Sequence, residues 1–264
     1  MIKFRESGSE DKKKLMDFLN GKPVYHTFIL SDIEQYGFDK EFQKVYVQED
    51  DKKIQGVFLR YFNNFIVAGD DKVIMFDKVA ELIDNSITTI MGNADIVNGI
   101  TSKLSRNAEL IYNNLYTHEK SVEADKSIKY NYAELEDTDR IYEFLMTFPE
   151  MKKLYSEKKM LENRLENGEG VHIFIEDNGK IIAHGNSAAS ADKTCMMGGI
   201  CVAEEYRKKG YAKAILLKLC EHILNEGKIP CIFAPESENY SCFPETGFDI
   251  YGLWGVAQLE NKNV

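Results

Sequence analysis

The sequence predicts a mixed α/β (α+β) protein, in which helices flank a sheet and the same architecture occurs twice along the chain. Three observations support this fold class. Residues 194–234 follow the order strand, basic glycine-containing loop, helix and strand. Residues 171–188 have the alternation of a hairpin around an Asn-Gly turn. Helix and strand signals then recur in a similar order within residues 1–120.

In the first half, the pattern predicts a helix over residues 7–20 and two strands, 44–48 and 54–61, around a charged turn. The remaining elements expected there are a strand at 65–68, a helix at 79–83, a strand at 87–91 and a helix from 94 to 104. Asn93 has the residue type of an N-cap for the last helix. No period of sequence self-similarity is evident, so the proposed duplication depends on element order alone.

The second half begins after a polar, poorly periodic linker over residues 119–126. An extended segment is expected at 128–135, followed by a helix that Asp137 caps and a second helix over 150–167. Three strands (171–176, 180–188 and 194–202), a helix (212–226) and two further strands (231–234 and 254–259) complete the chain. The glycine pair Gly198-Gly199 inside a strand indicates a bulge or a close backbone approach.

A basic loop precedes the helix at 212–226. Free N–H groups and the positive end of the helix dipole favour an anion at a helix N-terminus. Gly210 allows a ligand to approach the backbone, because it has no Cβ. The loop carries the remaining candidate anion contacts, Arg207, Lys208, Lys209, Tyr211 and Ala212. A solvated basic surface is the alternative reading of these residues alone.

The pattern Arg-x-x-Gly-x-Ala at 207–212 resembles the acetyl-CoA pyrophosphate loop of the GNAT superfamily of acyl-CoA N-acyltransferases. Asn239 after the next strand, and Gly247-Phe248 beyond it, extend the resemblance to about residues 128–259. It implies a mixed, mostly antiparallel sheet that is splayed at its central strands. We therefore expect a GNAT domain at residues 127–264, and a degenerate GNAT-like domain without a CoA loop at residues 1–120.

The resemblance also implies direct transfer of an acetyl group from acetyl-CoA to a primary amine of a small molecule or protein. Backbone groups of Ile200, Cys201 and Val202 are expected to bind pantetheine, and an N–H near Gly199 or Ile200 is expected to stabilise the oxyanion. Variable segments around residues 148–170 and the face toward the first half are the expected acceptor site.

The catalytic acid and base are less well marked. Many GNAT enzymes carry a tyrosine four residues before the Gly-Phe pair, but Phe243 occupies that position and has no proton to donate. Tyr240 is the candidate acid and Glu176 the candidate base, with Cys242, His184, Glu236 and Glu238 as alternatives. Asn239 and Phe243 are included among the expected cofactor contacts. A CoA-binding sensor or structural module without catalysis is the alternative function.

Composition limits the partners. The formal net charge of −10 argues against nucleic acid and mildly favours a cationic acceptor. The five histidines and five cysteines show no metal-ligand spacing, so no metal cofactor is expected. No apolar stretch approaches the roughly 20 residues of a membrane span, and no signal-peptide core is present at the N-terminus. We expect a cytoplasmic protein of open oligomeric state, with acetyl-CoA as its cosubstrate.

Overall fold

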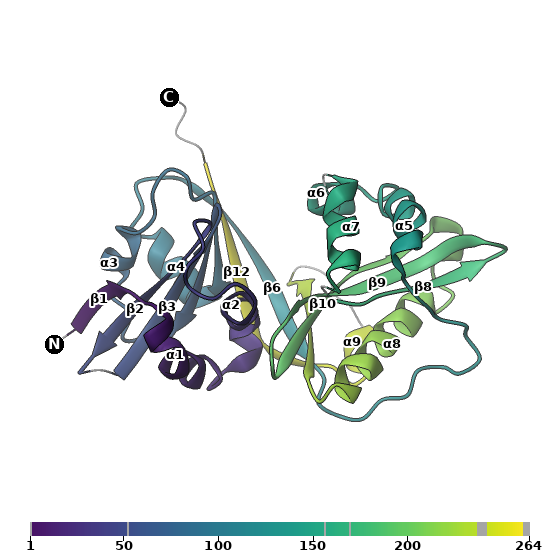
Figure 1. Cartoon of the computed structure of the whole chain (residues 1–264), viewed down its shortest axis with the longest axis horizontal. Coiled ribbons are helices and arrows are strands. Elements are labelled where there is room, and N and C mark those ends of the chain that lie inside the picture. Colours follow the sequence, from purple (N-terminus) through teal and green to yellow (C-terminus); the bar gives the residue numbers. More distant parts are fainter. Residues whose placement is uncertain (1, 52, 156, 169, 237–241, 261–264) are drawn as a thin grey trace.

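The computed structural model describes residues 2–51, 53–155, 157–168, 170–236 and 242–260. Their strands form a 12-stranded mixed sheet that runs through both halves of the molecule, in the order β1-β2-β3-β4-β5-β12-β6-β11-β10-β9-β8-β7. Figure 1 shows two lobes joined by β6 and β12. Among the described residues, no helix is both long enough and apolar enough to cross a membrane.

Most of the predicted elements are present, and β1, α2 and β6 are additional elements that the sequence analysis did not predict. The strands are β1 (Ile2–Glu6), β2 (Gln43–Asp50), β3 (Lys53–Tyr61), β4 (Asn64–Gly69), β5 (Thr89–Asn93), β6 (Ala108–Thr117), β7 (Asn131–Tyr132), β8 (His172–Asp177), β9 (Lys180–Ser190), β10 (Thr194–Val202), β11 (Ile229–Pro235) and β12 (Asp249–Leu259). The α-helices are α1 (Lys12–Leu19), α2 (Pro23–Tyr36), α3 (Phe76–Ala80), α4 (Ala94–Thr101), α5 (Thr138–Leu145), α6 (Pro149–Leu154), α7 (Lys158–Glu166), α8 (Tyr211–Asn225) and α9 (Cys242–Glu245). Short 3-10 turns precede α1, α5 and the loop before α8.

The two halves repeat one strand–helix–strand–helix–strand unit. It consists of β4-α3-β5-α4-β6 in the first half and β10-α8-β11-α9-β12 in the second. The first two strands of each unit pair in parallel, β4 with β5 and β10 with β11. The helix between them has 15 residues in α8 and 5 in α3. The structure therefore confirms the duplicated α/β architecture, and the first copy has a much shortened helix where the second has its basic loop.

The last strand of each unit crosses to the other half. β6 pairs with β11, and β12 pairs with β5. The two crossing strands also pair with each other along their length, from Ala108↔Leu259 to Thr117↔Asp249. This exchange holds the lobes in one sheet. The boundary expected near residues 120–127 remains a prediction, because β6 and β12 each lie between strands of both halves.

Helices cover both faces of each lobe. In the first lobe, α1 and α2 pack on one face around Leu19, Ile33 and Val57, and α3 and α4 pack on the other. In the second lobe, α8 packs on β8–β11 through Ile215 and Leu219, and α5 and α7 cover the opposite face. Burial of these apolar side chains is the main force that holds each layer together.

Helix α2 belongs to the first half but also contacts the second. Thr27 Oγ1 donates a hydrogen bond to Thr194 Oγ1 of β10 at 2.9 Å, and both residues are completely buried. Phe28 stacks on Phe233 of β11 with ring centroids 6.1 Å apart. The first lobe is thereby packed directly against the strands that carry the candidate site.

Local predictions differ from the structure in a few places. Asn93 caps α4 as expected, since its Oδ1 accepts hydrogen bonds from Asp95 N and Ile96 N. The helix expected over 150–167 is divided into α6 and α7, and the extended segment at 128–135 contributes only β7. Asp137 stands at the N-cap of α5, but its carboxylate accepts from Glu134 N and from the Arg140 side chain instead of from a backbone N–H of the helix.

Candidate active site

The parallel strands β10 and β11 separate halfway along their length. Their pairing runs from Thr194↔Ile229 to Met197↔Ile232 and then stops, although both strands continue. On its other edge, β10 is bulged against β9 between Gly198 and Cys201. Gly199 adopts a left-handed φ of +59°, and a Cβ there would run into Asn186 Oδ1. The bulge and the splay predicted from the Gly198-Gly199 pair are therefore present.

The splay opens a cleft of about 410 Å³. Its walls come from β10, the first turns of α8, β11 and α9, with one residue of α6. The lining residues are Met151, Met197, Gly198, Gly199, Ile200, Ala212, Lys213, Leu216, Ile232, Phe233, Ala234 and Phe243. The cleft is mostly apolar and narrow, and exposed backbone of Gly198–Ile200 forms one side, so it suits an extended chain with amide groups.

The basic loop stands at one end of this cleft. Gly210 is the N-cap of α8 with a left-handed φ of +89°, and it provides no side-chain cap. The first N–H groups of α8 are thus left for an external acceptor. Arg207 is tied back by Nε, which donates to Val202 O at 3.2 Å. Lys209 Nζ lies 5.0 Å from the ring centroid of Tyr206, whose hydroxyl donates to Asp177.

Two buried histidines fix the peptide at the bulge. His184 Nδ1 lies 3.0 Å from Gly199 O, and because a carbonyl only accepts, this nitrogen carries the proton. His184 Nε2 then accepts from His172 Nδ1, also at 3.0 Å. The Gly199–Ile200 peptide is trans, so its N–H points opposite to its C=O. With Gly199 O held toward β9, the N–H of Ile200 faces the cleft.

Burial keeps these histidines neutral. It lowers the pKa of His184 to about 4, and it lowers the pKa of His172 well below the usual value, with a further contribution from His184. Burial also lowers the pKa of His26, on α2, to about 4. A neutral His184 keeps the single proton assignment that the contact with Gly199 requires.

These histidines predict an acid-sensitive fold. The unfolded chain binds their protons near pH 6.5 and the folded chain only near pH 4, so the histidines' contribution to stability is complete above pH 6.5 and is lost as the pH falls toward 4. The expected loss is about 3 kcal/mol for each such histidine by pH 4. Urea denaturation between pH 7.5 and 4.5 measures it. His26→Asn should flatten the profile, and the same difference in stability between pH 7.5 and 4.5 in this variant and in the wild type would contradict the prediction.

The structure brings three of the predicted cofactor residues, Ile200, Ala212 and Phe243, to the lining of the cleft. Gly210, Tyr211 and Ala212 lie at the start of α8, Ile200 lines the cleft wall, and Phe243 lines its inner end. Cys201 turns its side chain away, into the core beneath α5 and α7. Burial raises the pKa of its thiol to about 12, so it is not a nucleophile at neutral pH. Val202 pairs with Ala183 of β9.

The predicted base, Glu176, lies away from the cleft, and the predicted acid, Tyr240, is not among the described residues. Tyr240 and the cofactor candidate Asn239 lie outside the described residues. Glu176 is the penultimate residue of β8, where its carboxylate pairs with Arg140 and accepts from Asn131 Nδ2 at 3.4 Å. It is not among the residues that line the cleft. Its contacts give it a structural role at the β8–β9 hairpin. Among the described residues, no cluster of His, Cys, Asp and Glu has the size of a metal site.

Two elements that the sequence analysis did not predict, β6 and α2, contribute side chains near the cleft. Tyr116 of β6 stacks on Phe243 with centroids 4.8 Å apart, and it thereby supports the inner end of the cleft from the other half of the chain. Helix α2 was also missed, although Pro23 at its first turn and Gly37 beyond its end are typical helix boundary signals. Its side chains, including Phe28 and Asp32, line a cavity together with Arg164 and Ala188 of the second half.

Comparisons with known proteins agree with this geometry. Residues 135–242 match the model of the acetyltransferase (GNAT) family. A Drosophila protein of solved structure is similar over 98% of this chain and 99% of its own, with a TM-score of 0.71 at 9% identity. A tandem GNAT protein from the clavulanic acid biosynthesis pathway is similar over 100% of both chains, with a TM-score of 0.59 at 11% identity.

An acetyltransferase of the GNAT family from Colwellia psychrerythraea covers 97% of this chain and 99% of its own, with a TM-score of 0.58 at 16% identity. A search of curated protein sequences gave no match. The splayed sheet and its cleft define the class of fold as GNAT-type. Residues 135–242 are similar to the acetyltransferase (GNAT) family, and the chain as a whole shares the two-domain fold of these solved structures.

Proposed function

We propose that this protein is an N-acetyltransferase that moves the acetyl group of acetyl-CoA directly to a primary amine of a small molecule. The observation that carries the proposal is the cleft itself. It runs from the free N-terminus of α8 to the bulge at Gly198 and Gly199, and a second cavity adjoins it there. A cofactor in the cleft and an acceptor in the cavity would thus meet at one point.

The residues of this cleft match the parts of acetyl-CoA. The N–H groups of Tyr211 and Ala212, the helix dipole and the nearby lysines suit the pyrophosphate. The unpaired stretch of β10 suits the pantetheine amides, because its N–H and C=O groups beyond Met197 have lost their partners on β11. The N–H of Ile200, aimed into the cleft, suits the oxygen of the thioester as it becomes an oxyanion.

The transfer then needs few further groups. The amine nitrogen bonds to the acetyl carbon, the carbon–sulfur bond breaks, and CoA leaves as a thiolate. The proton that the amine loses passes through water to this thiolate. Holding both reactants side by side supplies much of the rate. An acyl-cysteine route is disfavoured, since burial raises the pKa of Cys201, Cys220 and Cys231 to about 12.

One observation favours a second function, a CoA-binding sensor that transfers nothing. Phe243 lies at the inner end of the cleft and packs on Tyr116 and Phe248, and a phenyl ring cannot protonate the departing thiolate. Transfer without this acid remains chemically reasonable, because CoA thiolate is a tolerable leaving group near neutral pH. We therefore place the enzyme first.

Two measurements test the proposal. We expect calorimetric titration to show acetyl-CoA binding at micromolar to millimolar concentration, and free-thiol assays to show CoA release that depends on an added amine. No binding at millimolar acetyl-CoA would exclude both functions. Tight binding without thiol release across a broad amine panel would support the sensor over the enzyme.

A further inference from the structure

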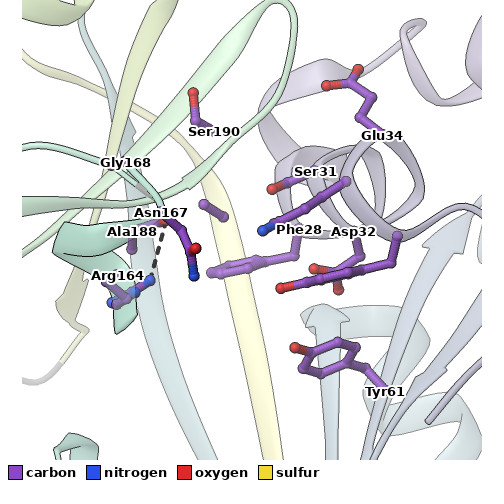
Figure 2. Close-up of a pocket in the computed structure, with 14 residues that line it drawn as sticks. Phe28, Ser31, Asp32, Glu34, Tyr61, Arg164, Asn167, Gly168, Ala188 and Ser190 are labelled. Carbon is purple, nitrogen blue, oxygen red and sulfur yellow. Dashed lines mark hydrogen bonds between the residues drawn. The ribbon is translucent and has the colours of Figure 1, made fainter. Parts of the chain in front are cut away.

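A space continuous with the transfer point extends to the first half of the chain. A cavity of about 700 Å³ is lined by Gly198 and Gly199 at one end. A neighbouring cavity of about 570 Å³ reaches α2. The two share the lining residues Tyr61, Arg164, Asn167 and Ala188, so they form one space between the lobes. Figure 2 shows Arg164 and Asn167 on one side of this space and Ser31, Asp32 and Tyr61 on the other.

Arg164 of α7 is the positive group of this space. Its Nη1 donates to Tyr155 Oη and its Nη2 to Ala188 O, both at 3.3 Å. These contacts orient the guanidinium without neutralising it, and it forms no ion pair with a carboxylate among the described residues. An oriented arginine with donors to spare is well suited to a carboxylate, which it can bind through two parallel hydrogen bonds.

Asp32 of α2 is the more buried of two acidic residues at the far end, and the other, Glu34, accepts a hydrogen bond from Asp192 N at 3.0 Å. Burial raises the pKa of the Asp32 carboxyl to about 7, and burial is the cause that accounts for the shift. Within the part of the chain that the structure describes, no side chain forms an ion pair with it; its own carbonyl accepts from Gln43 Nε2 at 3.2 Å. The rings of Tyr36 and Tyr61, with centroids 5.8 Å apart, line the same end. A carboxylate beside aromatic faces favours a cation.

Arg164 and Asp32 line one space but do not pair with each other. Charges without a protein partner in a partly enclosed site cost folding free energy, and a ligand of complementary charge would offset this cost. We propose that this space binds a basic amino acid, with its carboxylate on Arg164, one ammonium at Asp32 and the other amine beside Gly198 and Gly199. The proposal rests on the acetyl transfer argued above and specifies its acceptor.

The chemistry of the acceptor follows from these three points. One anionic and two amine groups on a short chain match one cationic anchor, one anionic anchor and the transfer point. The acceptor nitrogen beside Gly199 bonds to the acetyl carbon, and the carbon–sulfur bond breaks. The departing CoA thiolate takes up the proton that this nitrogen loses. Because Asp32, Tyr36 and Tyr61 come from the first half, this half recognises the acceptor although its own parallel strand pair has no basic loop.

The test uses L-lysine and L-ornithine with two analogues, cadaverine, which lacks the carboxylate, and 6-aminohexanoate, which lacks the α-amine. We expect kcat/KM to be highest for one of the two amino acids and about 100-fold lower for each analogue, because a partly buried charge is then left unpaired. Arg164→Gln should reduce kcat/KM for the amino acid to the value for cadaverine and change kcat/KM for cadaverine by less than about threefold. Asp32→Asn should reduce kcat/KM for the amino acid to the value for 6-aminohexanoate and change that for 6-aminohexanoate by less than about threefold.

Matched controls remove a charge outside the space. Lys159→Gln changes an exposed residue of α7 that pairs with Glu162, and Asp17→Asn changes an exposed residue of α1. Both should leave the preference for the amino acid intact. Asp32→Asn should also raise Tm at pH 8 but not at pH 4, since a raised carboxyl pKa means that stability is lost as the pH rises through 7. A more stable variant that loses the acceptor separates recognition from folding.

Titration of the amino acids into the protein with CoA present provides a readout that does not depend on turnover. Equal affinity for lysine, ornithine and both analogues, with normal acetyl-CoA binding, would overturn this inference and leave the proposed function standing. Failure of acetyl-CoA itself to bind would instead reject the proposed function. Lysine binding that Arg164→Gln leaves unchanged would show that the anchor is wrongly assigned.

Discussion

Gly210→Glu should abolish acetyl-CoA binding and leave the protein folded. Gly210 is the N-cap of α8 at a φ of +89°, and nothing lies within 4 Å of the position that a Cβ would take, so the new side chain has room. Its carboxylate would stand where the pyrophosphate is expected, and a left-handed φ adds about 1–2 kcal/mol of strain. We expect the Kd for acetyl-CoA to rise at least about 100-fold, equivalent to about 2.7 kcal/mol.

The opposite end of the same helix provides the control. Gly227 also has a left-handed φ, +76°, and open space around its Cβ position. Gly227→Glu therefore adds the same charge and similar backbone strain, but far from the basic loop. It should lower Tm about as much as Gly210→Glu and leave the Kd within about threefold. If Gly210→Glu retains wild-type affinity, the loop at 207–212 is not the pyrophosphate site. If both variants lose affinity for acetyl-CoA, the loss comes from destabilisation of the fold and not from the loop itself.

The second half of the fold was largely predictable because its signals are local. The Asn178-Gly179 hairpin, the Gly198-Gly199 bulge and the glycines that bound α8 each specify backbone geometry within a few residues. The crossing of β6 and β12 was not predictable. Both strands satisfy their edges with partners more than 100 residues away in sequence, such as Thr117 with Cys231, and no local pattern encodes that pairing.

The candidate site also has one part that local sequence signals predict and one part that they do not. Much of its cofactor side lies in one continuous segment, 198–212, in which Ile200 and Ala212 line the cleft and Gly210 is the N-cap of α8. Its acceptor side combines Asp32, Tyr61 and Arg164 from three distant elements. The sequence around each of these residues gives no sign of a site. Asp32, for example, lies in a helix, where an aspartate usually faces water. Only the packing of α2 against β9 and β10 makes the charge of Asp32 unusual.

His184→Leu should slow the acetyl transfer without weakening acetyl-CoA binding. His184 Nδ1 holds Gly199 O at 3.0 Å, and this contact turns the N–H of Ile200 into the cleft. Without the donor, the peptide is free to rotate and the buried carbonyl loses its partner, at a cost of about 1–3 kcal/mol in stability. Loss of an oriented oxyanion donor lowers kcat by about 100-fold in comparable sites. We expect a decrease of this size in kcat, with KM for acetyl-CoA within about threefold.

His184→Asn separates orientation from packing. The amide nitrogen of asparagine takes nearly the place of Nδ1 and still donates to Gly199 O, so kcat should recover to within about tenfold of the wild type. Since burial lowers the pKa of His184 to about 4, neither the wild type nor the variant should show a kcat transition near pH 6.5 that belongs to this residue. A folded His184→Leu protein with wild-type kcat would mean that the Ile200 N–H does not act on the thioester. Equal loss in both variants would point to packing around His172 instead.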